Sequence, residues 1–173
     1  MTDNNAAQLF VRSITDRAKA RQRTLVFPES QDERTVQAVR SLHERGIVRC
    51  VLVGEGPDVP GVERVVPAVD RRRDRIVELL LARRSAKGLT ADVAEELSRR
   101  PLYFADGLVA LAEVDGCVAG AAHSTGDVVR AALWTVGTAT GVRTVSSAFY
   151  MLVNDFRGCG SEVLTFTDCA VVP

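Results

Sequence analysis

The residues best suited to chemistry lie in the segment 115–130, which combines a turn of small residues with hydroxyl groups and an arginine. The small side chains at 120–122 allow a ligand to approach the backbone closely. Ser124 and Asp127 have the spacing of a capping box, in which Asp replaces the usual Glu. The segment therefore predicts the end of a strand, a tight turn and the start of a helix.

Such a helix start favours an anion as its ligand, because its first N–H groups have no partner within the helix and the helix dipole adds positive charge. The hydroxyl groups of Ser124 and Thr125 can donate to phosphate oxygens, and Arg130 follows within the next turns. We expect these three residues to bind a phosphoryl group. The competing interpretation is an ordinary capped helix with a surface arginine, which the spacing alone slightly favours. The segment matches neither the P-loop nor the dinucleotide-binding pattern.

Other groups that could take part in chemistry favour structural roles. His123 can act as a base, but a turn histidine more often orients its loop through a hydrogen bond. The four cysteines form no C-x-x-C pair and the chain has only two histidines, so no metal site is expected. The basic run 71–75 leads into a helical pattern, which favours a solvated helix start over a phosphate-binding patch.

The overall charge excludes some classes of partner. Twenty-two basic residues balance twenty-two acidic ones, which gives no electrostatic reason to expect binding to nucleic acid or to a membrane. The first residues are polar and lack a signal-peptide pattern, and no apolar run reaches membrane-spanning length. A cytoplasmic protein is the expectation.

The elements that must position these residues form a predicted α/β domain. Apolar runs at Thr24–Phe27 and 50–53 predict two buried strands, and the pattern between them predicts a helix that ends near Gly46. A strand–helix–strand unit implies a parallel sheet. Further helices are expected at 9–18, 74–86, 90–98, 101–114 and 126–138, and short strands at 65–66 and 117–119. The anion-binding loop then follows a parallel strand at its carboxyl end, where α/β sheets bind ligands.

The end of the chain has a different pattern. Two strand-like runs, 142–153 and 162–172, are joined by a polar, Gly-containing connection, which predicts an antiparallel pair. A two-stranded unit is marginally stable alone, so either the pair docks on a partner or the chain is cut short, and we favour the cut. We predict an α/β domain with the anion-binding loop at 1–145 and the incomplete start of a second domain at 146–173.

Short motifs in order along nearly the whole chain resemble those of the phosphate acetyltransferase and phosphate butyryltransferase family. They are Pro-Glu-Ser at 28–30, Glu-Arg-Gly-Ile at 44–47, Lys-Gly-Leu-Thr at 87–90, Glu-Val-Asp-Gly at 113–116, the segment 123–130, Ser-Ser-Ala-Phe at 146–149 and Phe-Thr-Asp-Cys-Ala-Val at 166–171. Each motif is weak, but the ordered set is specific. The resemblance covers about the first half of a typical member.

The resemblance implies a two-domain α/β fold related to isocitrate dehydrogenase, with the active site between the domains. Arg84 lies in the family's Arg-x-x-Lys-Gly segment and Arg130 in its His-Ser-Thr helix, and both positions resemble substrate-binding arginines. The neighbouring Arg83 can equally fill the first role. The family's catalytic aspartate and its Ser-Arg pair belong to a region absent from this chain, so the catalytic residues here are unknown. This chain departs from the family pattern at Gly126 and Ala131, and neither change removes a polar group.

The function implied by the resemblance is that of a phosphate acetyltransferase of acetate metabolism, which converts acetyl-CoA and phosphate to acetyl phosphate and coenzyme A. Its partners would be coenzyme A and phosphate or acetyl phosphate as substrates, without a further cofactor, and the full-length protein would be a homodimer. The alternatives are a phosphate butyryltransferase and a non-catalytic domain that binds phosphate or coenzyme A or serves assembly. We expect the 173 residues alone to show little or no activity.

Overall fold

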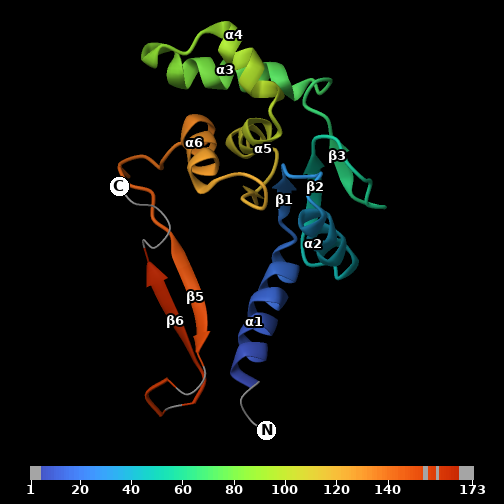
Figure 1. Ribbon diagram of the computed structural model, residues 1–173, viewed down its shortest axis with the longest axis vertical. Coiled ribbons are helices and arrows are strands. Elements are labelled where there is room, and N and C mark those ends of the chain that lie inside the picture. Colours follow the sequence, from blue (N-terminus) through green and yellow to red (C-terminus); the bar gives the residue numbers. More distant parts are fainter. Residues whose placement is uncertain (1–4, 154–155, 159, 168–173) are drawn as a thin grey trace. The chain divides into compact units, whose positions relative to one another are not determined.

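The computed structural model describes residues 5–153, 156–158 and 160–167. They divide into two compact units (Figure 1). One unit is formed by residues 22–137, and the other combines residues of 1–21 and 138–173. The predicted domain boundary between residues 145 and 146 stays a prediction.

A four-stranded parallel sheet forms the centre of the unit 22–137. Its strands are β1 (Thr24–Phe27), β2 (Arg49–Val53), β3 (Glu63–Val65) and β4 (Gly116–Cys117). They lie side by side in the order β3-β2-β1-β4, with Val26 of β1 between Val51 of β2 and Cys117 of β4. The predicted parallel pairing of the first two strands is confirmed. Because all four strands run in one direction, their carboxyl ends share one edge of the sheet.

The helices of this unit are α2 (Glu33–Glu44), α3 (Arg72–Arg84), α4 (Ala91–Arg99), α5 (Pro101–Ala110) and α6 (Thr125–Thr135), and a short 3-10 turn, η1 (Ser85–Lys87), follows α3. Their starts follow local signals. The Thr90 hydroxyl accepts from the N–H of Val93, Pro101 occupies the first position of α5, and Ser124 caps α6.

Two helices end earlier than predicted. The helix expected at 101–114 ends at Ala110, because Ala112 adopts a left-handed conformation with φ of 57° and the N–H of Glu113 turns back to the carbonyl of Leu108. The helix expected to reach 138 ends at Thr135, where the N–H of Gly137 turns back to Ala132 in the same way. The strand expected at 117–119 forms only at Gly116–Cys117.

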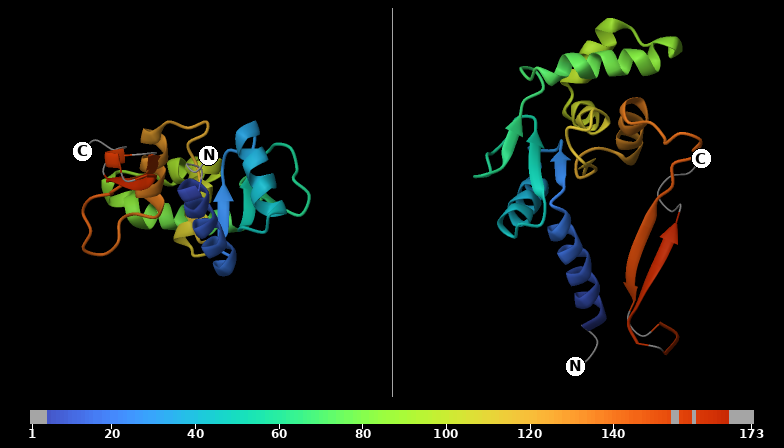
Figure 2. Two further views of the ribbon diagram at one scale, coloured as in Figure 1. Left: turned by 90° about the horizontal axis from the view of Figure 1, so that it is seen from below. Right: turned by 180° about the vertical axis from the view of Figure 1, so that it is seen from behind.

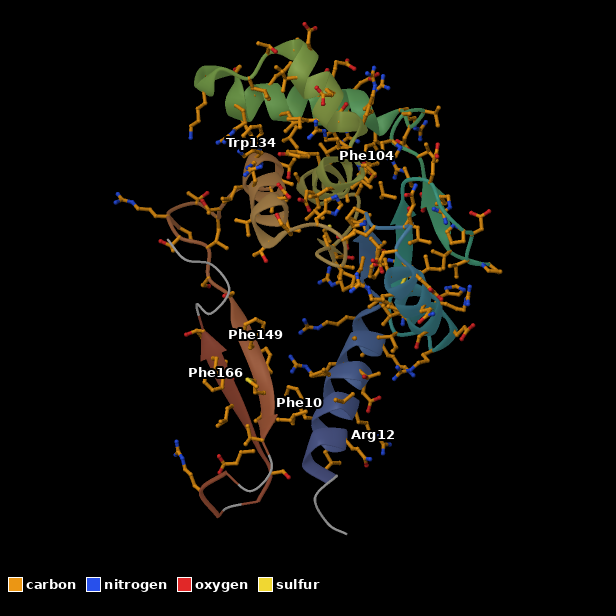
Figure 3. All side chains as sticks on the ribbon, in the orientation of Figure 1. Phe10, Arg12, Phe104, Trp134, Phe149 and Phe166 are labelled. Carbon is orange, nitrogen blue, oxygen red and sulfur yellow. The ribbon has the colours of Figure 1, made fainter. Side chains whose placement is uncertain are left out.

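Alternate side chains of the central strands enter two hydrophobic clusters on opposite faces of the sheet. Val26, Val51 and Val53 belong to a larger cluster with α3, α4, α5 and α6, and Phe27 and Leu52 belong to a smaller one with α2. Figure 2 shows the sheet between these helices, and Figure 3 labels Phe104 of α5, which is fully buried. The sheet is therefore covered on both faces, as a parallel sheet requires.

The other unit contains α1 (Asn5–Arg21) and an antiparallel pair, β5 (Ala148–Val153) and β6 (Glu162–Thr167), connected through a 3-10 turn, η2 (Phe156–Gly158). Phe149 lies opposite Phe166, and the ring of Phe10 on α1 lies 6.1 Å from that of Tyr150. The strand expected from 142 begins only at 148, where Ala148 pairs with Thr167, the last described residue of β6. The predicted strand residues 168–172 lie outside the described residues.

The predicted fold class is confirmed: an α/β protein with a parallel sheet flanked by helices and an antiparallel strand pair near the C-terminus. In the part of the chain that the structure describes, no helix has both the length and the apolar composition needed to cross a membrane.

Candidate functional site

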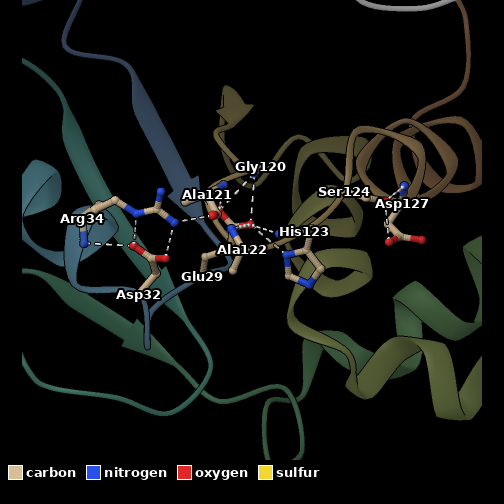
Figure 4. Close-up of polar contacts among 9 residues, drawn as sticks. All are labelled: Glu29, Asp32, Arg34, Gly120, Ala121, Ala122, His123, Ser124 and Asp127. Carbon is tan, nitrogen blue, oxygen red and sulfur yellow. Dashed lines mark hydrogen bonds and ion pairs between the residues drawn. The ribbon is translucent and has the colours of Figure 1, made fainter.

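The turn that follows β4 is closed around a carboxylate of the protein itself. Glu29, two residues after β1, accepts hydrogen bonds from the backbone N–H groups of 120–123 at 2.8–3.1 Å (Figure 4). The side chain is 2% exposed. The turn that the sequence suggested as a place of close ligand approach is thus occupied by an internal anion.

The topology of the sheet brings these groups together. From β1 the chain proceeds to β2 and β3 on one side, and it then crosses to β4 on the other side of β1. The strand order therefore reverses between β1 and β4, and in open α/β sheets such a point forms a crevice at the carboxyl ends. Gly120 has φ of 108°, a conformation that suits glycine and directs successive N–H groups toward one point.

The carboxyl group of Glu29 is ionised over the usual pH range. Burial raises its pKa, but the N–H donors of the turn and the His123 ring outweigh burial and lower the pKa to about 2. On the other side of the turn, Arg34 donates to the carbonyl of Ala121 and forms an ion pair of 2.7 Å with Asp32 (Figure 4). The turn is therefore held through both its N–H groups and a carbonyl.

His123 extends this arrangement toward a pocket. Its Nδ1 lies 2.8 Å from Oε1 of Glu29, which agrees with the interpretation of His123 as a hydrogen-bonded turn residue. The adjacent pocket has a volume of about 230 Å³ and lies at the carboxyl ends of β1 and β2. It is lined by Pro28, Glu29, Ser30, Gln31, Asp32, Gly54, Glu55, Pro101, Ala122 and His123.

Ser124, Thr125 and Arg130 gather on the first turns of α6, which begins directly after this turn. The Ser124 hydroxyl accepts from the N–H of Asp127 at 3.2 Å and donates to its carboxylate at 2.7 Å. The Arg130 guanidinium donates to the same carboxylate at 3.2 Å. The predicted capping pair is present, but the Asp127 carboxylate binds the serine hydroxyl and the arginine. Thr125 is the first residue of α6 and is exposed.

The structure also brings Arg84 to α6. Its guanidinium lies over the ring of Trp134, 4.6 Å from the ring centre, in cation–π contact. Since Trp134 follows Arg130 by four residues on a helix, these two residues share one face of α6, and Arg84 of α3 packs against that face. The alternative residue, Arg83, instead donates to the carbonyl of Val136 at 2.6 Å.

A pocket of about 230 Å³ adjoins this stack and is lined by Arg84, Lys87, Gly88, Leu89, Val93 and Trp134. Beside it, the ring of Tyr103 meets Trp134 edge-on at 6.2 Å. Burial raises the pKa of Tyr103, and the positive charges of Arg130, Arg100 and Arg84 oppose that rise.

Two further ionisable groups of the same unit, the buried Asp106 and the half-buried Cys117, have raised pKa values. Asp106 of α5 is 4% exposed, and its Oδ2 has no hydrogen-bond partner among the described residues. Burial raises the pKa of Asp106 to about 6, against a smaller opposing effect from its hydrogen bond with Cys117. Burial also raises the pKa of the Cys117 thiol. Among the described residues, no group of three or more His, Cys, Asp or Glu side chains is arranged to hold a metal ion.

Sequence reasoning missed the roles of Glu29 and Trp134. In the sequence, Glu29 was noted only as part of a Pro-Glu-Ser motif, although a carboxylate two residues after a buried strand is a signal that could have identified it. Nothing in the sequence around Trp134 indicates that a residue fifty positions earlier stacks on it.

Comparisons with known proteins agree with this architecture. A sequence model of the family described as phosphate acetyl/butaryl transferase matches residues 9–173. A phosphate acetyltransferase of Pseudomonas aeruginosa is 38% identical over 170 residues, which cover 92% of this chain and 23% of that protein. A phosphate acetyltransferase of Paracoccus denitrificans is 38% identical over 162 residues, which cover 92% of this chain and 50% of that protein.

Solved structures of phosphotransacetylases also resemble this chain. A phosphotransacetylase from Streptococcus pyogenes matches with a TM-score of 0.82 at 27% identity and covers 95% of this chain and 52% of that one. The EutD phosphotransacetylase from Staphylococcus aureus matches with a TM-score of 0.78 at 30% identity and covers 94% of this chain and 51% of that one. The chain thus spans about half, or less, of the length of these relatives. Since the family model matches all but its first eight residues, the chain belongs to the phosphate acetyl/butaryl transferase family.

Proposed function

We propose that this chain supplies the phosphate- and coenzyme A-binding part of a phosphate acetyltransferase, which converts acetyl-CoA and phosphate to acetyl phosphate and coenzyme A. The observation that carries the proposal is the position of two arginines at one face of α6: Arg130 lies in its second turn, and Arg84 of α3 stacks on Trp134 one turn further. The relatives named phosphate acetyltransferase support the same reaction.

The start of α6 suits a phosphoryl group. The N–H groups of Thr125 and Gly126, as the first two of the helix, have no acceptor within it, and the helix dipole favours an anion there. The hydroxyls of Ser124 and Thr125 and the guanidinium of Arg130 add donors. Asp127 now accepts from Ser124 and Arg130, and a bound phosphoryl group would take over these two donors.

The pocket between α6 and the end of α3 suits the nucleotide end of coenzyme A. Arg84 and Lys87 supply positive charge for phosphate, and Trp134 offers an aromatic face. Coenzyme A and phosphate act in this proposal as substrates, and no further cofactor is needed. We further propose that the full-length protein is a cytoplasmic enzyme of acetate metabolism and that it forms a homodimer. Butyryl transfer is the alternative within the same family.

Titration with phosphate tests the anion site on this chain. Arg130→Ala removes a charge-assisted hydrogen bond, so it should weaken phosphate binding by roughly tenfold or more. Arg84→Ala should weaken the binding of coenzyme A by a similar factor. Arg40→Ala is the matched control, because Arg40 is exposed on α2 at the opposite face of the sheet and should leave both affinities unchanged.

A substitution that is expected to strengthen phosphate binding gives a second test. Asp127→Asn removes a negative charge that competes for Arg130, and asparagine can still accept from Ser124, so phosphate should bind several-fold more tightly. Calorimetry gives the affinities. Equal affinities in wild type and all variants would reduce the start of α6 to an ordinary capped helix.

The catalytic turnover of the chain is predicted separately from its substrate binding. The resemblance assigns the catalytic aspartate and its Ser-Arg pair to a region outside these 173 residues, so the chain alone should bind its substrates with little formation of acetyl-CoA. The thioester absorbance measures this directly. Robust turnover by the purified chain would show that catalytic groups lie within it.

A further inference from the structure

The Glu29 carboxylate is surrounded by donors on both of its oxygens. Oε2 accepts from the N–H groups of Gly120 and Ala121, and Oε1 accepts from those of Ala122 and His123. The Nδ1 of His123 approaches the same Oε1 at 2.8 Å. The contact between carboxylate and imidazole therefore belongs to an arrangement fixed by the backbone, and it is not a chance surface contact.

We propose that Glu29 is a positioning residue that holds the neutral His123 ring in its Nδ1-protonated form, so that Nε2 offers a lone pair to the pocket beside it. An ionised carboxylate has no proton to donate, so the nitrogen that approaches it must carry the hydrogen. In a neutral imidazole the other nitrogen is then an acceptor. Free histidine has no such constraint, and the tautomer is thus imposed by Glu29.

In this tautomer Nε2 of His123 is an acceptor nitrogen beside the pocket. Of the other polar side chains that line the pocket, the Ser30 hydroxyl is bonded to the carbonyls of Val53 and Glu55 and Asp32 is paired with Arg34, whereas Gln31 and Glu55 also offer acceptor oxygens. The His123 side chain is 36% exposed, so a small ligand can reach it. The carboxylates of Glu29, Asp32 and Glu55 oppose an anion here, so the group that Nε2 accepts from is a neutral or cationic donor such as a hydroxyl, thiol or ammonium.

The same contacts connect Glu29 to the start of α6. The N–H of His123 is bound to Glu29, and the next residue, Ser124, is the cap of α6. Loss of the carboxylate should therefore move the helix start. Any resulting change in phosphate binding rests on the proposed phosphate site, whereas the shift of the helix start and the tautomer do not.

Nitrogen-15 NMR of the imidazole rings tests the proposal on the intact chain. The chain has only two histidines, so a His43→Gln variant assigns the His123 signals. At about pH 8.5, where an ordinary imidazole is neutral, Nδ1 of His123 should appear as the protonated nitrogen and Nε2 as the unprotonated one. Protonated and unprotonated imidazole nitrogens have well-separated nitrogen-15 chemical shifts. A wild-type spectrum with the proton on Nε2 would overturn the proposal without need of any Glu29 variant.

Glu29→Gln tests whether the carboxylate is the cause. An amide both accepts and donates, so the variant should shift the His123 tautomer toward Nε2–H and move the amide proton signals of 120–123. Glu78→Gln, an exposed change on α3, should do neither. An unchanged tautomer in folded Glu29→Gln would contradict the positioning role.

Phosphate titration of the same variants separates this proposal from the proposed function. If the wild type binds phosphate, Glu29→Gln should bind it about tenfold more weakly. If the wild type does not bind phosphate, the anion site fails, and the NMR result still decides the role of Glu29.

Discussion

At the scale of single residues, two buried carboxyl groups of this chain show opposite behaviour. Glu29 receives donors from four consecutive residues, and its pKa falls to about 2, whereas Asp106 has one weak partner in Cys117, and burial raises its pKa to about 6. Both residues are at most 5% exposed. The number of donors that the backbone aims at a carboxylate therefore decides its charge state more than burial does.

The two groups should have opposite effects on stability as pH changes. The folded pKa of Glu29 lies below its usual value of 4.5, so its contribution is present above about pH 4.5 and is lost as pH falls toward 2. The folded pKa of Asp106 lies above its usual value of 3.8, so the folded state binds the proton more strongly. Stability associated with Asp106 is therefore full below pH 3.8 and falls as pH rises through 6.

Asp106→Asn should raise the free energy of unfolding at neutral pH. Removing the buried charge should gain about 1–3 kcal/mol at about pH 7.5, and the gain should vanish near pH 4, where the wild-type carboxyl is already neutral. Urea unfolding at both pH values, followed by the fluorescence of the single tryptophan, measures this. A variant less stable than wild type at pH 7.5 would mean that the Asp106 carboxylate has a stabilising partner.

At the scale of elements, the approach of two helices depends on a missing side chain. A Cβ at Gly107 of α5 would lie 2.8 Å from two carbon atoms of Ile76 on α3, which is fully buried. Real carbon atoms do not approach so closely, so α5 and α3 would have to move apart. The glycine thus sets the packing distance of two helices that cover the sheet.

Gly107→Ala should destabilise the protein although alanine favours helix. Overpacking costs about 1–3 kcal/mol, and the gain in helix propensity offsets about 1 kcal/mol of it. The matched control is Gly126→Ala in the first turn of α6, where the nearest atom is the Ser124 hydroxyl oxygen at 3.9 Å. Thermal melting should show a lower Tm for the first variant and an unchanged or higher Tm for the second. Equal effects would show that Ile76 adjusts freely.

At the scale of the whole molecule, the two compact units differ in how much of their own core they contain. The four parallel strands and both hydrophobic clusters lie within residues 22–137. In the other unit, large apolar side chains of the hairpin are exposed, including Tyr150 at 63% and Phe149 at 50%. The unit 22–137 therefore has the contacts of an independently folding domain.

A fragment of residues 22–137 should fold by itself. Since its sheet and both clusters are complete, its Tm should lie within about 5 °C of that of the whole chain. A fragment 22–112, which lacks β4 and α6, is the control and should lose the cooperative transition. Circular dichroism measures both. A fragment 22–137 that melts without cooperativity would show that residues outside it complete the core.

The positions of most elements were determined by the sequence alone, because their signals are local. Caps such as Thr90 and Ser124, Pro101 at the start of a helix, and apolar runs act within a few residues of one another, so the helix starts and the parallel pairing of β1 with β2 could be predicted. Helix ends were less accurate, because Ala112 adopts a left-handed conformation that nothing about alanine indicates.

The composition of the candidate site was decided by the tertiary structure. Arg84, Ser124, Thr125 and Arg130 were named from motifs, yet their neighbours Asp127, Trp134 and Glu29 acquire roles only through packing. Glu29 meets the turn 120–123 because β4 pairs with β1, and that pairing joins residues more than ninety positions apart. Local patterns carry no information about which strands become neighbours, since strand order depends on how the helices cover both faces of the sheet.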